Sequence, residues 1–204
     1  MGGATEIYVN SVTSISFQSV LNVSENVIVT IRRPVIGIMG ANQPSTPSLE
    51  AAGRLGRLVA EAGWIVLTGG RPAGVMDAAN AGAKTVAGSL TVGILPTDSE
   101  GPVSKYVDVA VFTDLGNARN AINVLSSDVV VACGLEGPGT ASEVALALKA
   151  RRPTILLAVL PVASAFFRTL PGAHLLQDAE TPEEVIRIIE QQVGIPRWQS
   201  GPVG

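Results

Sequence analysis

Residues 134–143 read Gly-Leu-Glu-Gly-Pro-Gly-Thr-Ala-Ser-Glu, and they decide how the fold is interpreted. The apolar run Asp128–Cys133 precedes them, and a helical stretch that ends near Arg151 follows them. A strand, a glycine turn and a helix start can bind an anion, because backbone N–H groups can approach it and the helix N-terminus adds partial positive charge. A second turn of this kind, Thr68–Gly74, follows the apolar run Trp64–Leu67. Two such turns in one small domain indicate a small-molecule ligand that carries a phosphate.

Outward from these two turns, short apolar runs alternate with amphipathic stretches. Strands are expected at residues 34–39, 64–67, 90–95, 107–112, 128–133 and 154–157, and helices at residues 46–62, 75–86, 117–126, 140–150 and from 181 onward. Strands that are apolar on both faces and alternate with helices form a parallel sheet that is covered on both sides. We therefore predict an α/β fold, a Rossmann-like doubly wound parallel sheet of about six or seven strands with helices on both faces. Both glycine turns lie at the carboxyl edge of this sheet, where such folds bind ligands.

The ligand-binding domain is predicted to span residues 32–194. Residues 1–31 contain no lysine or arginine and lack the basic region of a secretory signal. We expect them to form a weakly ordered extension or an extra strand at residues 27–31. Residues 195–204 are expected to form a C-terminal tail.

The composition narrows the classes of partner. Hydrophobic residues make up 47% of the chain and charged residues 15%, which favours a homo-oligomer, a dimer or a tetramer, with apolar interfaces. The longest apolar run, residues 154–160, falls short of the ~20 residues of a membrane-spanning helix, so no membrane partner is expected. A net charge of −3 and an aromatic content of 4% argue against nucleic acid. Cys133 is the only cysteine, which fits a cytoplasmic protein without disulfides.

The candidate ligand-binding residues gather at four strand ends. The first strand ends at Gly40 without a G-x-G-x-x-G pattern, so we expect no NAD site, and a tight turn would also explain this glycine. Arg71 directly follows two glycines, and a guanidinium suits phosphate because it is planar and always charged. The predicted binding residues are Gly40, Ala41, Asn42, Gly69, Gly70, Arg71, Gly116, Asn117, Arg119, Asn120, Gly137, Pro138, Gly139 and Thr140.

Two acidic residues accompany the 134–143 turn. Glu143 lies one turn into the following helix, where favourable interaction with the helix dipole alone would explain it. A catalytic role for Glu143 requires an opposing cation, which Arg119 could supply unless that arginine is simply a solvated surface charge. Glu136 lies in the turn itself, and its charge would repel a phosphate unless the side chain points to solvent or to a cation.

No metal or serine-hydrolase site is expected. His174 is the only histidine and has no partner at metal-ligand spacing, so the sequence predicts no protein-ligated metal. The chain also lacks the G-x-S-x-G pattern of serine hydrolases. Cys133 is expected to pack at the end of its strand, close to the proposed ligand.

The pattern Gly69-Gly-Arg-x-x-Gly-Val-Met76 together with Gly137-x-Gly-Thr-x-x-Glu143 resembles the Rossmann-like superfamily formerly described as possible lysine decarboxylases. That group includes the cytokinin-activating phosphoribohydrolases and the molybdenum-cofactor carrier proteins. The segments at residues 34–40, 63–76, 118–127 and 137–149 are more similar to the carrier proteins. The resemblance covers roughly residues 33–170. It implies a homo-oligomer that holds molybdenum cofactor, a pterin with a phosphate and a metal dithiolene, without chemical change.

The same resemblance implies an alternative, a phosphoribohydrolase that cleaves the N-glycosidic bond of a nucleoside 5′-monophosphate. Arg119 and Glu143 match the catalytic arginine and glutamate of those enzymes. However, the hydrolase turn begins Pro-Gly-Gly where this chain has Leu135-Glu136-Gly137, and the hydrolase arginine precedes a lysine where this chain has Asn120. Both differences lower the positive charge at the phosphate, so carriage is the first expectation and hydrolysis the second. A nucleotide-binding sensor is a third reading that the sequence leaves open.

Overall fold

The computed structural model describes residues 32–99 and 101–195. The chain divides into two units, residues 1–33 and 34–204, and the fold described here is that of the second. The predictions for residues 1–31 and for residues 196–204 lie outside the described residues. Within the described ranges, no helix is long and apolar enough to cross a membrane.

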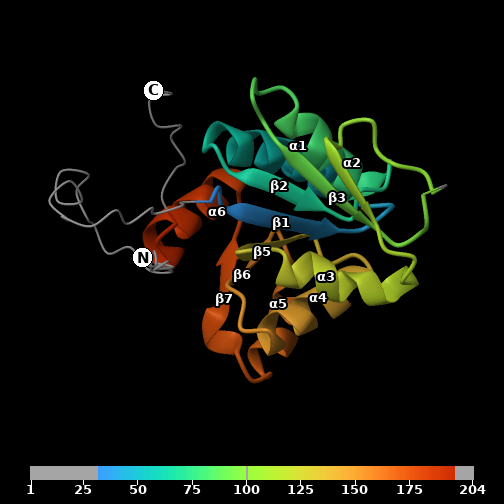
Figure 1. Cartoon of the computed structure of the whole chain (residues 1–204). Helices are drawn as coiled ribbons and strands as arrows, with labels where there is room; N and C mark the ends of the chain where they lie inside the picture. Colours follow the sequence, from blue (N-terminus) through green and yellow to red (C-terminus); the bar gives the residue numbers. More distant parts are fainter. Residues whose placement is uncertain (1–31, 100, 196–204) are drawn as a thin grey trace, which may run out of the picture. The chain divides into compact units, whose positions relative to one another are not determined.

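One parallel sheet of seven strands runs through the described part of the second unit (Figure 1). Its spatial order is β4-β3-β2-β1-β5-β6-β7, so the chain leaves the centre at β1, reaches one edge at β4 and returns beside β1 at β5. The strands are β1 (Val35–Gly40), β2 (Ile65–Thr68), β3 (Thr91–Leu95), β4 (Val109–Phe112), β5 (Val129–Cys133), β6 (Thr154–Leu157) and β7 (Leu176–Ala179). The predicted α/β fold is confirmed, and the reversal of strand order beside β1 creates the crevice where such sheets bind ligands.

Helices cover the two faces of the sheet in separate groups. The group on one face comprises α1 (Thr46–Glu61), α2 (Gly74–Ala83) and α6 (Pro182–Ile188), and the group on the other comprises α3 (Asn120–Leu125), α4 (Pro138–Lys149) and α5 (Pro161–Arg168) (Figure 1). Shorter turns are the 3-10 helices η2 (Gly116–Arg119) and η3 (Ala173–Leu175) and the π-helical turn η4 (Ile189–Val193). Fully buried Trp64, Leu55 and Ile36 belong to the core beneath the first group.

Local capping signals explain where two of these helices begin. Ser45 is the N-cap of α1, and its side chain accepts a hydrogen bond from the Ser48 N–H. Thr181 caps α6 in the same way by accepting from the Glu184 N–H. The Glu184 carboxylate in turn accepts a hydrogen bond from the Glu180 N–H at 3.0 Å.

Three features differ from the sequence-based expectation. Neither the strand β7 nor the helix α5 was predicted. The strand β7 is a short Leu-Gln-Asp-Ala segment, which lacks the apolar run that identified the other strands. The strand β4 is exposed along its whole length, because an irregular connection rather than a helix joins it to β3.

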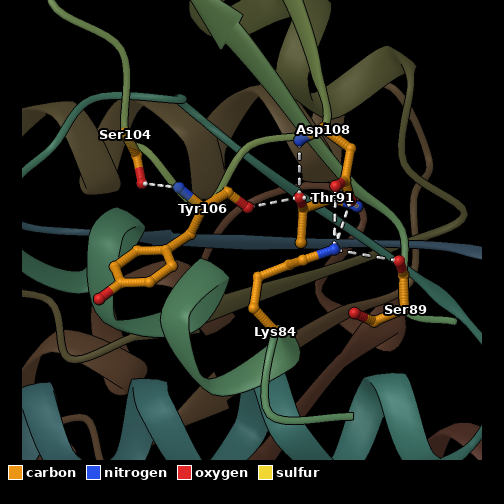
Figure 2. A network of polar contacts seen from close by, with 6 residues as sticks. All are labelled: Lys84, Ser89, Thr91, Ser104, Tyr106 and Asp108. Atoms are coloured by element: carbon orange, nitrogen blue, oxygen red, sulfur yellow. Dashed lines mark hydrogen bonds and ion pairs between the residues drawn. The ribbon is translucent and has the colours of Figure 1, made fainter. Parts of the chain in front are cut away.

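A polar network anchors that connection between β3 and β4 (Figure 2). Lys84 Nζ lies 2.9 Å from Asp108 Oδ1, and the Thr91 N–H donates to Asp108 Oδ2 at 2.8 Å. The Thr91 hydroxyl donates to the Tyr106 carbonyl at 2.6 Å. Burial alone would raise the pKa of Asp108, but the hydrogen bonds from Lys84 and Thr91 outweigh it and hold the pKa below its ordinary value. The network therefore keeps an ionised carboxylate at the start of β4 and fixes that strand against β3.

Candidate functional site

Both glycine turns open into one cavity of about 410 Å³ at the carboxyl edge of the sheet. Its walls come from the turns that follow β1, β2 and β5 and from the segment η2–α3. The lining residues are Ile38, Met39, Gly40, Ala41, Asn42, Gln43, Gly69, Arg71, Met76, Asn117, Arg119, Asn120, Glu136, Gly137, Pro138, Gly139, Thr140 and Glu143. The structure thus brings twelve of the fourteen predicted binding residues, and Glu143, to one cavity at the point where the strand order reverses.

Gly70 and Gly116 are the two predicted residues that do not line this cavity. Gly70 has a φ of 71°, its N–H donates to Thr68 Oγ1 at 3.1 Å, and its carbonyl accepts from the Ser104 N–H at 2.9 Å. A Cβ at Gly70 would also lie 2.9 Å from the Cα of Gly93. Gly116 has a φ of 52°, and its N–H donates to the Pro96 carbonyl at 2.9 Å. Both glycines shape the backbone of the site because other residues rarely adopt a positive φ.

Arg119 is a buried cation in the wall of the cavity. It ends η2, is only 8% exposed, and its Nε has no hydrogen-bond partner among the described residues. Burial lowers the pKa of this guanidinium, the charge of Glu143 raises it, and the charge of Arg71 lowers it again. A guanidinium nevertheless stays protonated in proteins. A buried charge without a hydrogen-bonded counter-ion is costly, so this arrangement favours an anionic ligand.

The backbone of Gly69 makes room for that guanidinium. A Cβ at this position would overlap Arg119 Nη1 and would lie 2.7 Å from both Arg119 Nη2 and Met76 Sδ. The glycine that follows β2 therefore lets the Arg119 side chain lie against the main chain at the floor of the cavity. This contact explains why the turn after β2 and the helix after β4 contribute to one site.

Glu143 and Thr140 add buried polar groups from α4. Glu143 is 6% exposed, and its Oε1 accepts a hydrogen bond from Asn123 Nδ2 at 2.8 Å. Burial raises the pKa of Glu143 even though the bond from Asn123 and the charge of Arg119 oppose the shift. Thr140 is 2% exposed, and its hydroxyl has no hydrogen-bond partner among the described residues. The first turns of α4 thus present an unused hydroxyl beside the buried arginine.

Glu136 is exposed, in agreement with the first of the two sequence-based expectations, and it also has hydrogen-bond partners that the sequence did not indicate. Its Oε1 accepts from the hydroxyls of Ser45 at 2.7 Å and Ser48 at 2.8 Å, and its Oε2 accepts from the Ser45 N–H at 2.6 Å. The exposed carboxylate therefore faces no cation among the described residues, and it binds the N-terminus of α1. The hydrogen bond from the Ser45 hydroxyl is the largest cause that lowers the pKa of Glu136. Burial opposes it, and the bonds from the Ser48 hydroxyl and the Ser45 N–H lower the pKa further.

Cysteine and histidine contribute no ligands to this cavity. Cys133 is buried, and its thiol donates to the Ser48 carbonyl at 3.3 Å, so the predicted packing at the strand end is confirmed. Burial, with a smaller effect of the Glu136 charge, raises the pKa of Cys133 to about 12. His174 lies in η3. Among residues 32–99 and 101–195, no group of three or more His, Cys, Asp or Glu side chains could hold a metal ion.

Sequence reasoning missed three features of this site. Met76 and Gln43 line the cavity but were not among the predicted binding residues, and Met76 is also buried. Asn123 was not among them either, and its bond to Glu143 could not be foreseen. The apolar neighbours of Asn123 on α3 were the available signal, because a buried amide requires a hydrogen-bond partner.

Comparison with known proteins gives consistent relatives. The family model LDcluster4, of the SLOG cluster4 family, matches residues 33–186. The structure of the molybdenum cofactor binding protein from the phototrophic bacterium Rippkaea orientalis is 48% identical, with a TM-score of 0.76, and the match covers 80% of this chain and 99% of that one. The molybdenum cofactor carrier protein of Chlamydomonas reinhardtii is 44% identical, with a TM-score of 0.74 and coverage of 80% and 100%. An uncharacterized protein of Archaeoglobus fulgidus is 42% identical over 114 residues, which are 56% of this chain and 73% of that protein.

Proposed function

Because the chain belongs to the SLOG cluster4 family, we propose that it binds molybdenum cofactor and carries it without chemical change. The observation that carries this proposal is the buried guanidinium of Arg119 in the cavity wall, whose Nε has no hydrogen-bond partner among the described residues. Two similar solved structures support molybdenum cofactor as the cargo: a molybdenum cofactor carrier protein, which is 44% identical, and a molybdenum cofactor binding protein, which is 48% identical.

The phosphate of the cargo binds between α4 and the two arginines. The N-terminus of α4 supplies backbone N–H groups and partial positive charge, and Thr140 adds its unused hydroxyl. Arg119 and Arg71 supply two cations, which balance the charge of a phosphate monoester, about −1.5 to −2 at neutral pH. Binding therefore gives hydrogen-bond partners to groups that lack them in the protein alone.

The remaining part of the cavity accommodates the pterin. A volume of about 410 Å³ lies within the range of small-molecule sites, about 300–1,000 Å³. The residues Gly40, Ala41, Asn42 and Gln43 present backbone and amide groups on this side, and Met39 and Met76 present polarizable apolar surface. No residue acts as a metal ligand in this proposal, since the dithiolene of the cargo itself holds the molybdenum.

A phosphoribohydrolase is the second candidate. The observation that favours it is that Glu143 and Arg119 share one cavity wall, since those residue types perform N-glycosidic hydrolysis in the enzymes that this chain resembles. A buried carboxyl with a raised pKa could donate a proton to a leaving base. Against it, Asn123 already holds Glu143, and the ionised Glu136 lowers the positive charge around the phosphate.

The experiment that tests the proposal offers both cargoes to the protein. The chain is incubated without oxygen with purified molybdenum cofactor and, in parallel, with AMP, followed by gel filtration and product analysis. Co-elution of molybdenum and pterin fluorescence with the protein, with no free adenine, is the expected result. Release of adenine and ribose 5-phosphate from AMP would instead establish the hydrolase.

A homo-oligomeric, cytoplasmic carrier is part of the same proposal. The strand β4 is an apolar edge in which Val109, Val111 and Phe112 are 46%, 39% and 39% exposed. Two β4 strands related by a two-fold axis run antiparallel and can pair their free edges, as an exposed edge tends to do. The segment carries no charge, and the neighbouring Asp108 already forms an ion pair with Lys84, so a second copy meets no like charge there.

A further inference from the structure

Two segments that lead into helix N-termini line the cavity. They are residues 40–43, which precede α1, and residues 137–140, at the start of α4. The two helices have 16 and 12 residues. Each N-terminus could attract an anion through its free N–H groups and its dipole. A ligand with two phosphates could in principle use both.

The N-terminus of α1 is already occupied by a carboxylate of this chain. Glu136 lines the cavity and receives hydrogen bonds from the N–H and hydroxyl of Ser45 and from the hydroxyl of Ser48. These bonds hold the pKa of Glu136 below its ordinary value, so the side chain is ionised at neutral pH. The positive end of α1 is therefore neutralised and presents a negative charge to the cavity.

The N-terminus of α4 has no such occupant. Thr140 and Arg119 are 2% and 8% exposed, and the Thr140 hydroxyl and Arg119 Nε have no hydrogen-bond partner among the described residues. Arg71 also lines the cavity. The N-terminus of α4 is consequently open to an anion, whereas that of α1 is bound to the Glu136 carboxylate.

Because the cavity-lining side chains include only two cations, a second phosphate has no counter-ion there. Glu136 immediately precedes Gly137, the N-cap of α4. When one phosphate binds at the N-terminus of α4, a second phosphate attached to it therefore lies in the electric field of the Glu136 carboxylate. Like charges brought together at a binding site oppose binding and thereby give specificity.

We propose that Glu136 is a specificity-determining residue that admits guests with a single phosphate and rejects guests whose phosphate is extended to a pyrophosphate. This inference rests on the proposed function for the identity of the cargo, but it concerns the anion preference of the cavity itself. The Glu136 carboxylate occupies the N-terminus of α1, so only the N-terminus of α4 is left to bind a phosphate of the ligand.

The test uses inorganic phosphate and pyrophosphate as probes, because neither carries a pterin or nucleoside. Calorimetric titration of the wild-type chain is compared with Glu136→Gln, which keeps the shape of the side chain and removes its charge. We expect pyrophosphate to gain affinity by about tenfold and phosphate by less than about threefold. Glu50→Gln is the matched control, since Glu50 is an exposed carboxylate on α1 that does not line the cavity, and it should change neither affinity.

Equal gains for both anions, no gain for pyrophosphate, or no detectable binding of phosphate would overturn the inference. If the glutamine variant does not fold, Glu136→Gly removes the charge while leaving a turn-compatible residue, and the same comparison is made. Retention of molybdenum cofactor by the wild-type chain is measured separately. If the wild-type chain does not retain the cofactor, the proposed function is refuted. If it does retain the cofactor but Glu136→Gln has the same preference between phosphate and pyrophosphate as wild type, only the role of Glu136 is refuted.

Discussion

Substitution of Gly69 by alanine should weaken cofactor retention while leaving the fold intact. The added Cβ overlaps Arg119 Nη1 and lies 2.7 Å from Nη2, closer than real Cβ contacts permit. Both atoms are the far end of a flexible side chain, so the guanidinium can move aside where a backbone could not. The variant therefore displaces the buried cation from the cavity wall without removing it.

The size of the effect follows from these contacts. Turning Arg119 away from its preferred rotamer costs about 0.5–1.5 kcal/mol, which sets the expected loss of stability. A hydrogen bond to a charged group contributes about 1.5–3 kcal/mol. Its loss from the phosphate corresponds to an affinity about 10- to 150-fold lower. Function should thus fall much further than stability.

The assay combines equilibrium dialysis of molybdenum cofactor with urea unfolding. Two glycines of α1 provide matched controls. A Cβ at Gly53 would lie 3.6 Å from the Ala78 carbonyl, an ordinary contact, so Gly53→Ala should change neither quantity beyond a small helix-stabilising gain. A Cβ at Gly56 would overlap the backbone of Ala79, so Gly56→Ala should destabilise the fold.

A double-variant cycle decides whether Arg119 transmits the effect. In the Arg119→Ala background, most of the effect of Gly69→Ala should disappear, because the added Cβ then loses its two close contacts with the guanidinium and keeps the one with Met76 Sδ. Wild-type affinity in Gly69→Ala would refute the reasoning. The reasoning would also be refuted if Gly69→Ala lowered cofactor affinity by the same factor in the Arg119→Ala background as in the wild-type protein.

Three further outcomes are expected. Burial raises the pKa of Glu143, so ionising this carboxyl in the folded protein costs stability as the pH rises from its ordinary pKa of 4.5 through the raised folded value. Urea unfolding should therefore show Glu143→Gln becoming more stable than wild type as the pH rises through this window, and the variant should still retain cofactor. The Cys133 thiol, with its pKa raised to about 12 and its side chain buried, should react with a thiol reagent at pH 8 only after unfolding, so rapid labelling of the native protein would contradict this burial. Val111→Lys, on the exposed β4 edge, should yield smaller assemblies in analytical ultracentrifugation, and an unchanged sedimentation coefficient would place the interface elsewhere.

The sequence was informative where local patterns determine structure. The strand β6 begins and ends at the predicted residues, and α1 begins at Thr46 as predicted, because apolar runs and capping residues act locally. The grouping of Arg119 with the two glycine turns was predictable because parallel strands bring their carboxyl ends to one edge.

Long-range contacts were beyond this reasoning. The bonds of Glu136 to Ser45 and Ser48 join residues 91 and 88 positions apart, and no local pattern indicates such a pairing. The overlap that a side chain at Gly69 would cause with Arg119 likewise depends on how η2 packs against the turn after β2. The exposure of β4 could not be foreseen, since its Val-Ala-Val-Phe sequence is as apolar as that of a buried strand.

The position of the cargo's phosphate is the most direct test of the account. A crystal structure of the chain loaded with molybdenum cofactor should show phosphate oxygens within hydrogen-bond distance, about 3.2 Å or less, of Arg119 and the Thr140 hydroxyl. Glu136 should still be bound to Ser45 and Ser48 in that complex. A phosphate placed elsewhere, with Arg119 still unpaired, would contradict the central claim that this buried guanidinium exists to hold an anionic guest.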